Sequence, residues 1–432
     1  MSDVVTVVGG GLAGAEAAWQ LAERGIRVRL FEMRPTRLTP AHRTGFLAEI
    51  VCSNSLKSDL PFHASWLLKE ELRRLGSVLM RLADSVRVPA GGALAVDREQ
   101  FAKRTTEAIQ FHPNIEVIRE EVREIPAEGI TIVASGPLTS DALSESIRRF
   151  CGVEHLYFYD AISPIVDADT IDCSKVYRSN RYGKAGDDYL NCPMDRAQYD
   201  QFYDALVSAE STPMHPFEEA RFFESCLPIE ELARRGRDTL RFGPMRPVGL
   251  EDPKTGRAPY AVVQLRQEDL MQSSYNIVGF QNHLKFDEQK RILRMIPGLE
   301  KAHFLRFGQI HRNTYINAPQ ILLPTMASRR DPHVFFAGQL AGTEGYIENI
   351  ASGLVAGLNA ERMFRGQAPV VFPPETAIGS LCRYVSTPCR DFAPVNIHFG
   401  LLPQIDLPRR ASKADKQRAL CERALGAIAR GC

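Results

Sequence analysis

The stretch VVGGGLAGAEAAWQLAERGIRVRLFEMRP, residues 7–35, decides the fold of the amino-terminal part of the chain. A β-branched run at residues 4–8 predicts a strand that ends in glycines. Residues 13–24 have helical composition, Gly25 ends the helix, and residues 26–31 predict a second strand. Strand, helix and strand in this order form a βαβ unit, which predicts an α/β fold on a parallel sheet.

Three glycines with the spacing G-x-G-x-x-G lie where the first strand meets the helix. The first permits a tight turn, the second lets a pyrophosphate approach the backbone, and the third lets the helix pack closely. The helix N-terminus offers N–H donors, and an acidic residue ends the second strand, where it can accept hydrogen bonds from ribose hydroxyls. The sequence therefore predicts a dinucleotide site with Gly9, Gly10, Gly11, Leu12, Ala13, Gly14 and Glu32.

Two later segments favour FAD over NAD as this dinucleotide. The turn Ala134–Gly136 is similar to a small-residue motif of flavoproteins with two dinucleotide folds, and residues 334–353 are similar to their carboxyl-terminal flavin segment. A helix that begins near Gly345 would direct its positive end at the flavin, although the same helix could simply pack on the sheet. Because the chain has a single glycine fingerprint, we expect no tightly built nicotinamide site. The predicted FAD site also includes Gly136, Gly338, Gly345 and Tyr346.

The rest of the chain divides by composition. Residues 65–83 carry an apolar stripe that predicts one amphipathic helix, and residues 408–430 predict a basic helix. The middle is rich in aromatic and turn residues and predicts an inserted α+β domain. We expect a discontinuous Rossmann-like FAD-binding domain of the two-dinucleotide-fold type at residues 1–175 and 305–432, and a substrate-facing domain at residues 176–304.

The composition is that of an ordinary globular protein. Of the 432 residues, 44% are hydrophobic and 24% are charged, and the net charge of +1 neither requires nor excludes a polyanionic partner. No apolar run approaches the ~20 residues of a membrane helix. We therefore expect no membrane partner. Nine cysteines without CxxC pairs argue against a disulfide framework and a zinc site, so we expect no metal and a reducing cytoplasmic setting.

Two cysteines lie in polar, turn-like settings: Cys52 in AEIVCSNSLKS and Cys226 in FFESCLPIEEL. Hydroxyl and amide groups next to Cys52 can donate hydrogen bonds to a thiolate, and arginines follow Cys226. A lone cysteine is more often a small buried residue, so both interpretations stay open at this level. Without a proximal cysteine pair or a second nucleotide fold, a disulfide oxidoreductase is disfavoured.

Several blocks are specific to one group of flavoproteins rather than to flavoproteins at large. They include RPTRLTPAH (34–42), AEIVCSNSL (48–56), RVPAGGALAVDRE (87–99), FFESCLPIEELARRG (222–236), AVVQLRQED (261–269) and HRNTYINAP (311–319). With the glycine fingerprint they cover most of the chain, as far as residue 403. The sequence resembles the folate- and FAD-dependent tRNA (uracil-5-)-methyltransferase family, TrmFO. It departs from the family pattern at Arg43, Gly45 and Ser225, which puts local RNA contacts in doubt.

The resemblance implies C5-methylation of the T-loop uridine, uridine-54, of tRNA. The methylene group would come from 5,10-methylenetetrahydrofolate and be reduced by FAD, with NAD(P)H regenerating the reduced cofactor. By resemblance Cys226 is the nucleophile that attacks C6 and Cys52 is the general acid/base, and the two roles could be exchanged. His311 is a candidate folate-stacking residue, and a structural histidine fits it equally well.

Two groups of arginines that adjoin the cysteines are candidate RNA contacts. Neutralisation of phosphates is the usual source of RNA affinity, although each group alone could be a solvated surface. The expected partner is the T-arm of tRNA rather than DNA, and the target uridine is expected to flip out of its loop. The candidates are Arg34, Arg37, Arg43, Arg234, Arg235 and Arg237.

Three other functions fit parts of the sequence. A member of the same family that methylates rRNA would share all of this chemistry. A GidA-type flavoprotein that modifies the wobble uridine would share the amino-terminal fold, but we expect it to need a long additional helical domain. An RNA chaperone that binds flavin without turnover would not need both cysteine motifs.

Overall fold

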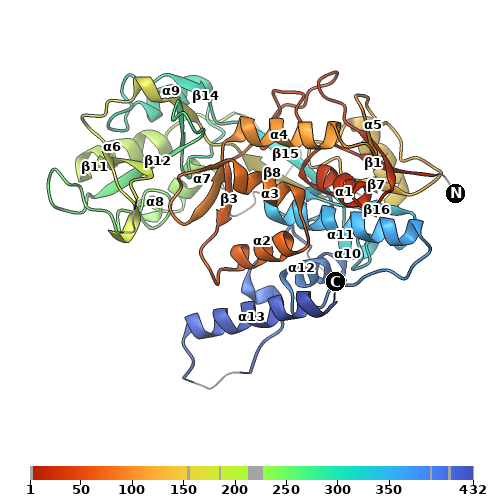
Figure 1. Ribbon diagram of the computed structural model, residues 1–432. Coiled ribbons are helices and arrows are strands. Elements are labelled where there is room, and N and C mark those ends of the chain that lie inside the picture. The colour runs from red at the N-terminus through yellow and green to blue at the C-terminus, as the bar shows by residue number, and fades with distance from the viewer. Residues whose placement is uncertain are drawn as a thin grey trace.

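The computed structural model contains two bodies with separate hydrophobic cores, and a carboxyl-terminal helix projects beyond them (Figure 1). The residues that the structure describes are 3–152, 156–183, 186–212, 227–389, 392–406 and 410–431, with the backbone alone at 156–160, 310–312 and 430–431.

The first body is built on a five-stranded sheet. Its strands, in spatial order, are β16 (Val334–Phe336), β7 (Thr131–Val133), β1 (Val4–Val8), β2 (Arg27–Phe31) and β6 (Ile115–Ile118). All neighbouring strands pair in parallel. The predicted α/β, Rossmann-like fold is confirmed, because the central strand β1 is hydrogen-bonded on both sides and its apolar residues are buried.

Two helices cover one region of this sheet and lie against each other. They are α1 (Leu12–Ala22) and α11 (Tyr346–Phe364). A Cβ atom at Gly353 would lie 2.2 Å from the carbonyl oxygen of Ala13, and one at Gly357 would lie 2.9 Å from that of Ala17. Only glycine allows the two backbones to approach so closely, and this contact sets the position of both helix N-termini. Helices α4 (Arg98–Gln110) and α5 (Asp141–Cys151) also pack in this body (Figure 1).

The second body is built on an antiparallel six-stranded sheet. Its strands, in spatial order, are β10 (Tyr177–Arg178), β11 (Tyr189–Met194), β12 (Ala261–Gln267), β13 (Ser274–Ile277), β9 (Ile165–Asp167) and β14 (Phe304–Arg306). Its helices are α6 (Arg196–Val207), α7 (Ile229–Arg234), α8 (Thr239–Phe242) and α9 (Phe286–Leu293). The division at 176 and 304 stays a prediction, and the sheet includes β9 before this range and β14 across its end.

Two smaller sheets lie between the main ones. Strands β8 (Leu156–Ala161) and β15 (Ile310–Tyr315) pair antiparallel and lead the chain into and out of the second body. Strands β3 (Ser55–Ser58), β5 (Ala93–Val96) and β4 (Arg87–Val88) form the other sheet. The segment that carries Cys52 runs directly into β3. The remaining short helices are α10 (Ala318–Ile321) and 3-10 turns at Ala168–Thr170, Arg181–Gly183, Gln339–Ala341 and Phe399–Leu401.

The prediction of one helix at residues 65–83 is wrong. The structure has two helices, α2 (Ala64–Arg74) and α3 (Val78–Ser85), with Gly76 between them at φ +75°. The buried carboxylate of Glu16 accepts hydrogen bonds from Ser77 Oγ (2.8 Å) and Leu79 N (3.1 Å), so it stabilises the start of the second helix. The apolar stripe continues across the break, so the pattern did not indicate it.

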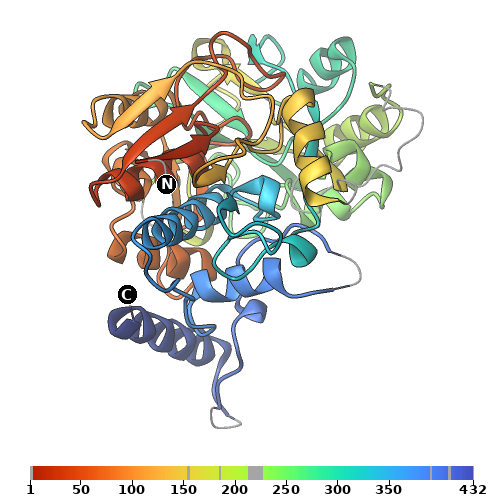
Figure 2. The same cartoon turned by 90° about the vertical axis from the view of Figure 1, so that its right-hand side faces the viewer.

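The carboxyl-terminal region packs on the first body through two helices. They are α12 (Ala377–Ser386) and α13 (Lys413–Gly431), and α13 lies below the rest of the molecule in Figures 1 and 2. The predicted basic helix is confirmed within the described residues, with its buried side at Cys421, Ala424 and Ile428 facing α2. Over the described ranges, no helix combines the length and the apolar character that crossing a membrane requires.

Candidate dinucleotide and cysteine site

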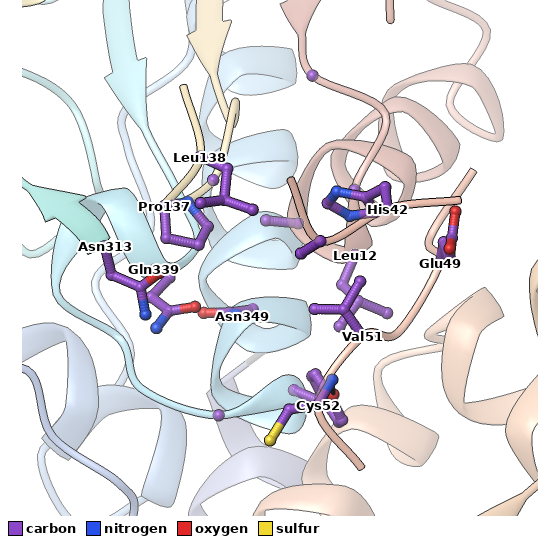
Figure 3. A pocket seen from close by; sticks show the side chains of 18 of the residues that line it. Leu12, His42, Glu49, Val51, Cys52, Pro137, Leu138, Asn313, Gln339 and Asn349 are labelled. Atoms are coloured by element: carbon purple, nitrogen blue, oxygen red, sulfur yellow. Dashed lines mark hydrogen bonds between the residues drawn. The ribbon is translucent and has the colours of Figure 1, made fainter. Parts of the chain in front are cut away.

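A cavity of about 360 Å³ lies at the carboxyl ends of four neighbouring parallel strands. The chain leaves β1, β2, β7 and β16 at this edge, which brings together turns that are far apart in the sequence. Figure 3 shows three amide side chains on one side, an apolar wall with a histidine on the other, and Cys52 at one end. The predicted residues that line the cavity are Gly9, Gly11, Leu12, Ala13, Glu32, Arg34, Cys52, Gly136, Gly338, Gly345 and Tyr346.

The three fingerprint glycines have different geometric roles. Gly9 has φ +103°, and a Cβ atom there would lie 2.5 Å from the carbonyl oxygen of Ala134. A Cβ atom at Gly14 would lie 1.8 Å from the carbonyl oxygen of Gly9, so the helix could not pack on the turn. At Gly11 a Cβ atom would meet nothing within 4 Å. The backbone at Gly11 therefore offers an open face on which a ligand can lie.

The acidic residue at the end of β2 is held in place by an arginine. Glu32 Oε2 accepts a hydrogen bond from Gly10 N (2.9 Å), and Glu32 Oε1 accepts one from Arg34 Nε (2.9 Å). Burial by itself would raise the pKa of Glu32, but the hydrogen bonds and charge of Arg34 outweigh it and lower the pKa below its usual value. The carboxylate therefore stays ionised and oriented toward the cavity.

The prediction that Arg34 contacts RNA is wrong for this structure. Its side chain is only 3% exposed, and its Nη1 atom lies 3.1 Å from Glu49 Oε2 in addition to the contact with Glu32. A guanidinium that two carboxylates neutralise inside the protein cannot reach a phosphate on the surface. Arg34 instead positions the acidic residue of the dinucleotide site.

Cys52 lies half-buried at the end of the cavity. Its backbone N–H donates to the hydroxyl of Tyr346 (2.9 Å), and its Sγ lies 3.7 Å from the carbonyl oxygen of Ala161. Burial raises the pKa of Tyr346, so this phenol stays a neutral acceptor. The expected hydrogen bond from Asn54 to the thiol is absent, because the Asn54 amide donates to Val96 O (3.1 Å) instead.

A buried arginine holds the chain just before Cys52. Arg98, at the start of α4, donates from Nη1 to the carbonyl oxygens of Ile50 (3.0 Å) and Val51 (3.1 Å). Its Nη2 lies 2.8 Å from Glu268 Oε2, at the end of β12. Because the ion pair is enclosed, it fixes the guanidinium against the cysteine segment.

A second buried arginine holds the chain just after Cys52. Arg266, on β12, donates from Nη2 to Ser53 Oγ (2.7 Å) and from Nε to Asn54 Oδ1 (2.9 Å). The amide of Asn54 in turn donates to the carbonyl oxygen of Gln267 (2.9 Å). The second body thus sets the position of a cysteine that belongs to the first.

Comparison with known proteins places this arrangement in one family. The model of the family described as glucose inhibited division protein A matches residues 4–368. Methylenetetrahydrofolate–tRNA-(uracil-5-)-methyltransferase TrmFO of Heliobacterium modesticaldum is 56% identical over 427 residues, 99% of this chain and 97% of the relative. TrmFO of Geobacter sulfurreducens is 55% identical over 430 residues, 99% and 98% of the two chains.

The chain belongs to the TrmFO family. Among solved structures, a GidA of Aquifex aeolicus superposes with a TM-score of 0.71 at 17% identity, covering 98% of this chain and 76% of that one. A second crystal form of the same protein gives a TM-score of 0.68 at 18% identity, with 90% and 70% covered. These likenesses confirm the flavoprotein-type fold of this TrmFO family member and no more.

Two residues predicted for TrmFO chemistry cannot be placed. Cys226 lies outside the described residues. His311 lies on β15, where its backbone pairs with Asp160, but its side chain is not among those described. Their roles stay predictions.

The remaining candidate RNA contacts lie on the surface, and most are paired with carboxylates. Arg37 is 47% exposed and contacts Glu121, whereas Arg234 contacts Glu231. Arg237 lies 2.7 Å from Asp200. Arg43 and Arg235 are exposed. RNA binding by these five arginines stays a prediction.

Residues that the sequence analysis did not select complete the site. Lys57, which lines the cavity, places Nζ 2.7 Å from the buried carboxylate of Glu348 at the start of α11. The block AEIVCSNSLKS contains this lysine, so its place near Cys52 in the sequence could have marked it as a candidate site residue. The amide side chains that line the cavity, Asn313, Gln339 and Asn349, have no local signal. Where side chains are described, no group of three or more metal-binding residues occurs.

Replacement of Arg266 by Gln is expected to make Cys52 at least about 10-fold more reactive toward iodoacetamide. Loss of two hydrogen bonds from a charged donor costs roughly 1.5–3 kcal/mol each, which favours local opening of the cysteine segment. Peptide mass spectrometry measures the rate at each cysteine. Exposed Cys173 is the internal control, and Arg178→Gln on β10 is the control variant. Unchanged Cys52 reactivity would contradict this positioning role.

Proposed function

We infer that this protein catalyses folate-dependent C5-methylation of a uracil in tRNA. The relatives that carry this activity in their names match almost the whole chain at 54–57% identity. The observation that carries the proposal is that Cys52 lines the same cavity as the dinucleotide glycines. A nucleophile or proton carrier and a redox cofactor can therefore act on one substrate.

The residues present fit FAD. The open face at Gly11 and the N-terminus of α1 can hold the pyrophosphate, and Glu32 can bind the ribose. Gly345 and Tyr346, at the N-terminus of α11, would hold the flavin end, where the positive end of the helix favours negative charge. When bound, FAD supplies the two electrons that turn a transferred methylene group into a methyl group.

The reaction needs a thiol because C5 of uracil is not nucleophilic by itself. Attack of a thiolate at C6 forms an S–C6 bond and moves the C5–C6 π electrons toward C5 and O4, so that C5 can attack the methylene carbon. The C5 proton must then be removed while the bond between the methylene carbon and the folate nitrogen breaks, so that tetrahydrofolate leaves. Two-electron reduction of the methylene group, with elimination of the thiolate from C6, releases the 5-methyluracil product. We propose Cys226 as the nucleophile and Cys52 as the general acid/base, on the resemblance to the family.

Several finer points belong to the same proposal. The target is the T-loop uridine, uridine-54, reached through the T-arm, and NAD(P)H regenerates the reduced cofactor. His311 stacks on the folate. The reducing cytoplasmic setting expected from the cysteine content likewise stays a prediction.

The test traces the origin of the methyl carbon in 5-methyluridine. Protein, NAD(P)H, tRNA and isotope-labelled 5,10-methylenetetrahydrofolate are incubated, and the nucleosides are analysed by mass spectrometry. We expect label in 5-methyluridine, with a loss of label when NAD(P)H is omitted, since folate delivers carbon at the oxidation level of formaldehyde. A tRNA with cytidine at the target position is the control and should stay unlabelled. Two parallel incubations supply labelled S-adenosylmethionine in place of labelled folate, or rRNA beside tRNA. Label from S-adenosylmethionine, or label in rRNA but not in tRNA, would contradict the proposal.

A further inference from the structure

Arg306, on the edge strand β14, is a buried cation that has no counter-charge among the residues that the structure describes. The residue is 8% exposed, and its Nε atom is enclosed with no hydrogen-bond partner. Among the described residues no carboxylate lies within ion-pair distance of this guanidinium. Burial of an uncompensated charge is unfavourable, and an anion that arrives from outside would compensate it.

The strand register places Arg306 near the cysteine end of the cavity. Arg306 lies opposite Ile165 on β9. Three residues from Ile165 and three from Arg306, Ile162 N donates to the carbonyl oxygen of Gln309 (2.8 Å). Ile162 also lines the cavity. The preceding carbonyl, that of Ala161, is the one that Cys52 Sγ contacts. The chain that carries Arg306 therefore leads directly to the end of the cavity where Cys52 lies.

Within the described ranges, Arg43 is a second arginine whose side chain pairs with no carboxylate, and its charge acts on Arg306. The pKa of Arg306 is lowered to about 10, by burial first and then by the positive charges of Arg98 and Arg43. The charge of Arg98 is matched by Glu268, whereas Arg43 is exposed and has no carboxylate partner within the part of the chain described here. Two unmatched guanidinium groups that repel each other form a site that an oxyanion would stabilise.

We propose that Arg306 and Arg43 form a receptor for a phosphodiester of the RNA substrate, beside Cys52. Arg43 contacts the phosphate from the surface and Arg306 from inside. The base that reaches Cys52 brings the phosphates of its own nucleotide with it, which favours a phosphodiester over the carboxylates of folate. The proposal rests on RNA as the substrate but not on which cysteine attacks, and it assigns Arg306 a task that its sequence context does not indicate.

The experiment measures RNA binding without turnover. A fluorescent T-arm stem–loop RNA is titrated with the FAD-loaded protein at several salt concentrations. Replacement of Arg306 by Gln should weaken binding about 10-fold and reduce the slope of log K against log salt by about 0.7–0.9, the value of one phosphate contact. Arg306→Lys should keep most of the slope. Arg27→Gln, an exposed arginine on β2, is the matched control and should change neither quantity.

The outcomes separate the possibilities. A normal RNA affinity and slope in Arg306→Gln, with a raised KM for 5,10-methylenetetrahydrofolate, would assign Arg306 to folate and overturn the proposal. If Arg306→Gln loses FAD or fails to fold, Arg43→Gln carries the test, because Arg43 is exposed and its replacement should lower the slope too. A protein that binds RNA with the expected slope but incorporates no labelled methyl group would overturn the proposed function alone.

Discussion

Gly11→Val is expected to yield a folded protein that has lost its FAD. Gly11 has φ −73°, which any residue adopts, and a Cβ atom there would meet no protein atom within 4 Å. The substitution therefore introduces no backbone strain and no clash within the chain. The valine side chain would instead occupy the open face where the pyrophosphate approaches, and we expect the flavin affinity to fall at least about 100-fold, the loss of roughly 3 kcal/mol of phosphate contacts.

Flavin absorbance per chain and the thermal unfolding of the apoprotein measure this effect. Glu23→Val, at the exposed end of the same helix, is the matched control and should keep its FAD. Gly14→Val should behave differently and fail to fold, because its Cβ atom would lie 1.8 Å from the carbonyl oxygen of Gly9. A Gly11→Val protein that is folded and retains its flavin would show that the dinucleotide lies elsewhere.

Cys52→Ala is expected to remove methylation of tRNA while FAD and RNA still bind. A general acid/base contributes roughly 10²–10⁴-fold to a rate, and alanine can carry no proton. The thiol makes a single polar contact among the described residues, at 3.7 Å to Ala161 O, so its removal should cost little stability. The backbone hydrogen bond of residue 52 to Tyr346 does not depend on the side chain and should persist.

The formation of 5-methyluridine and covalent trapping by RNA with 5-fluorouracil measure the two steps separately. In Cys52→Ala we expect no 5-methyluridine but a trapped adduct on Cys226, and in Cys226→Ala no adduct at all. Cys173→Ala, at an exposed cysteine, is the control and should be fully active. A wild-type adduct on Cys52 would reverse the two roles, and full activity of Cys52→Ala would refute a catalytic role for this thiol.

The sequence was sufficient where the determinants are local. The glycine spacing, the helix after it and Glu32 lie within one βαβ unit, and Gly9, Gly11 and Glu32 line the cavity. The start of α11 directly after Gly345 also agrees with the prediction, since a glycine that ends a turn marks the helix N-terminus. Resemblance to the family added the substrate and the cofactor.

The local sequence pattern did not predict the break between α2 and α3 or the burial of Arg34. The stripe at residues 65–83 does not show that Gly76 ends the first helix, or that Ser77 caps the second and is itself bound by Glu16, which lies far away in the sequence. An arginine is usually exposed, but Arg34 is buried because its guanidinium pairs with the carboxylates of Glu32 and Glu49. In both cases the partner that decides is a side chain whose position depends on the fold.

The sequence by itself determined the parallel α/β fold, and it predicted the dinucleotide residues; the two cysteines of the proposed chemistry came from the resemblance to the family and stay a prediction. Only the tertiary structure decided how Cys52 is held. Arg266 meets Ser53 and Asn54 across more than 200 residues of sequence, at 2.7 and 2.9 Å, because strand β12 packs beside the cysteine segment. A buried guanidinium needs partners or a ligand, and which of these it has depends on contacts between distant segments that no local pattern encodes.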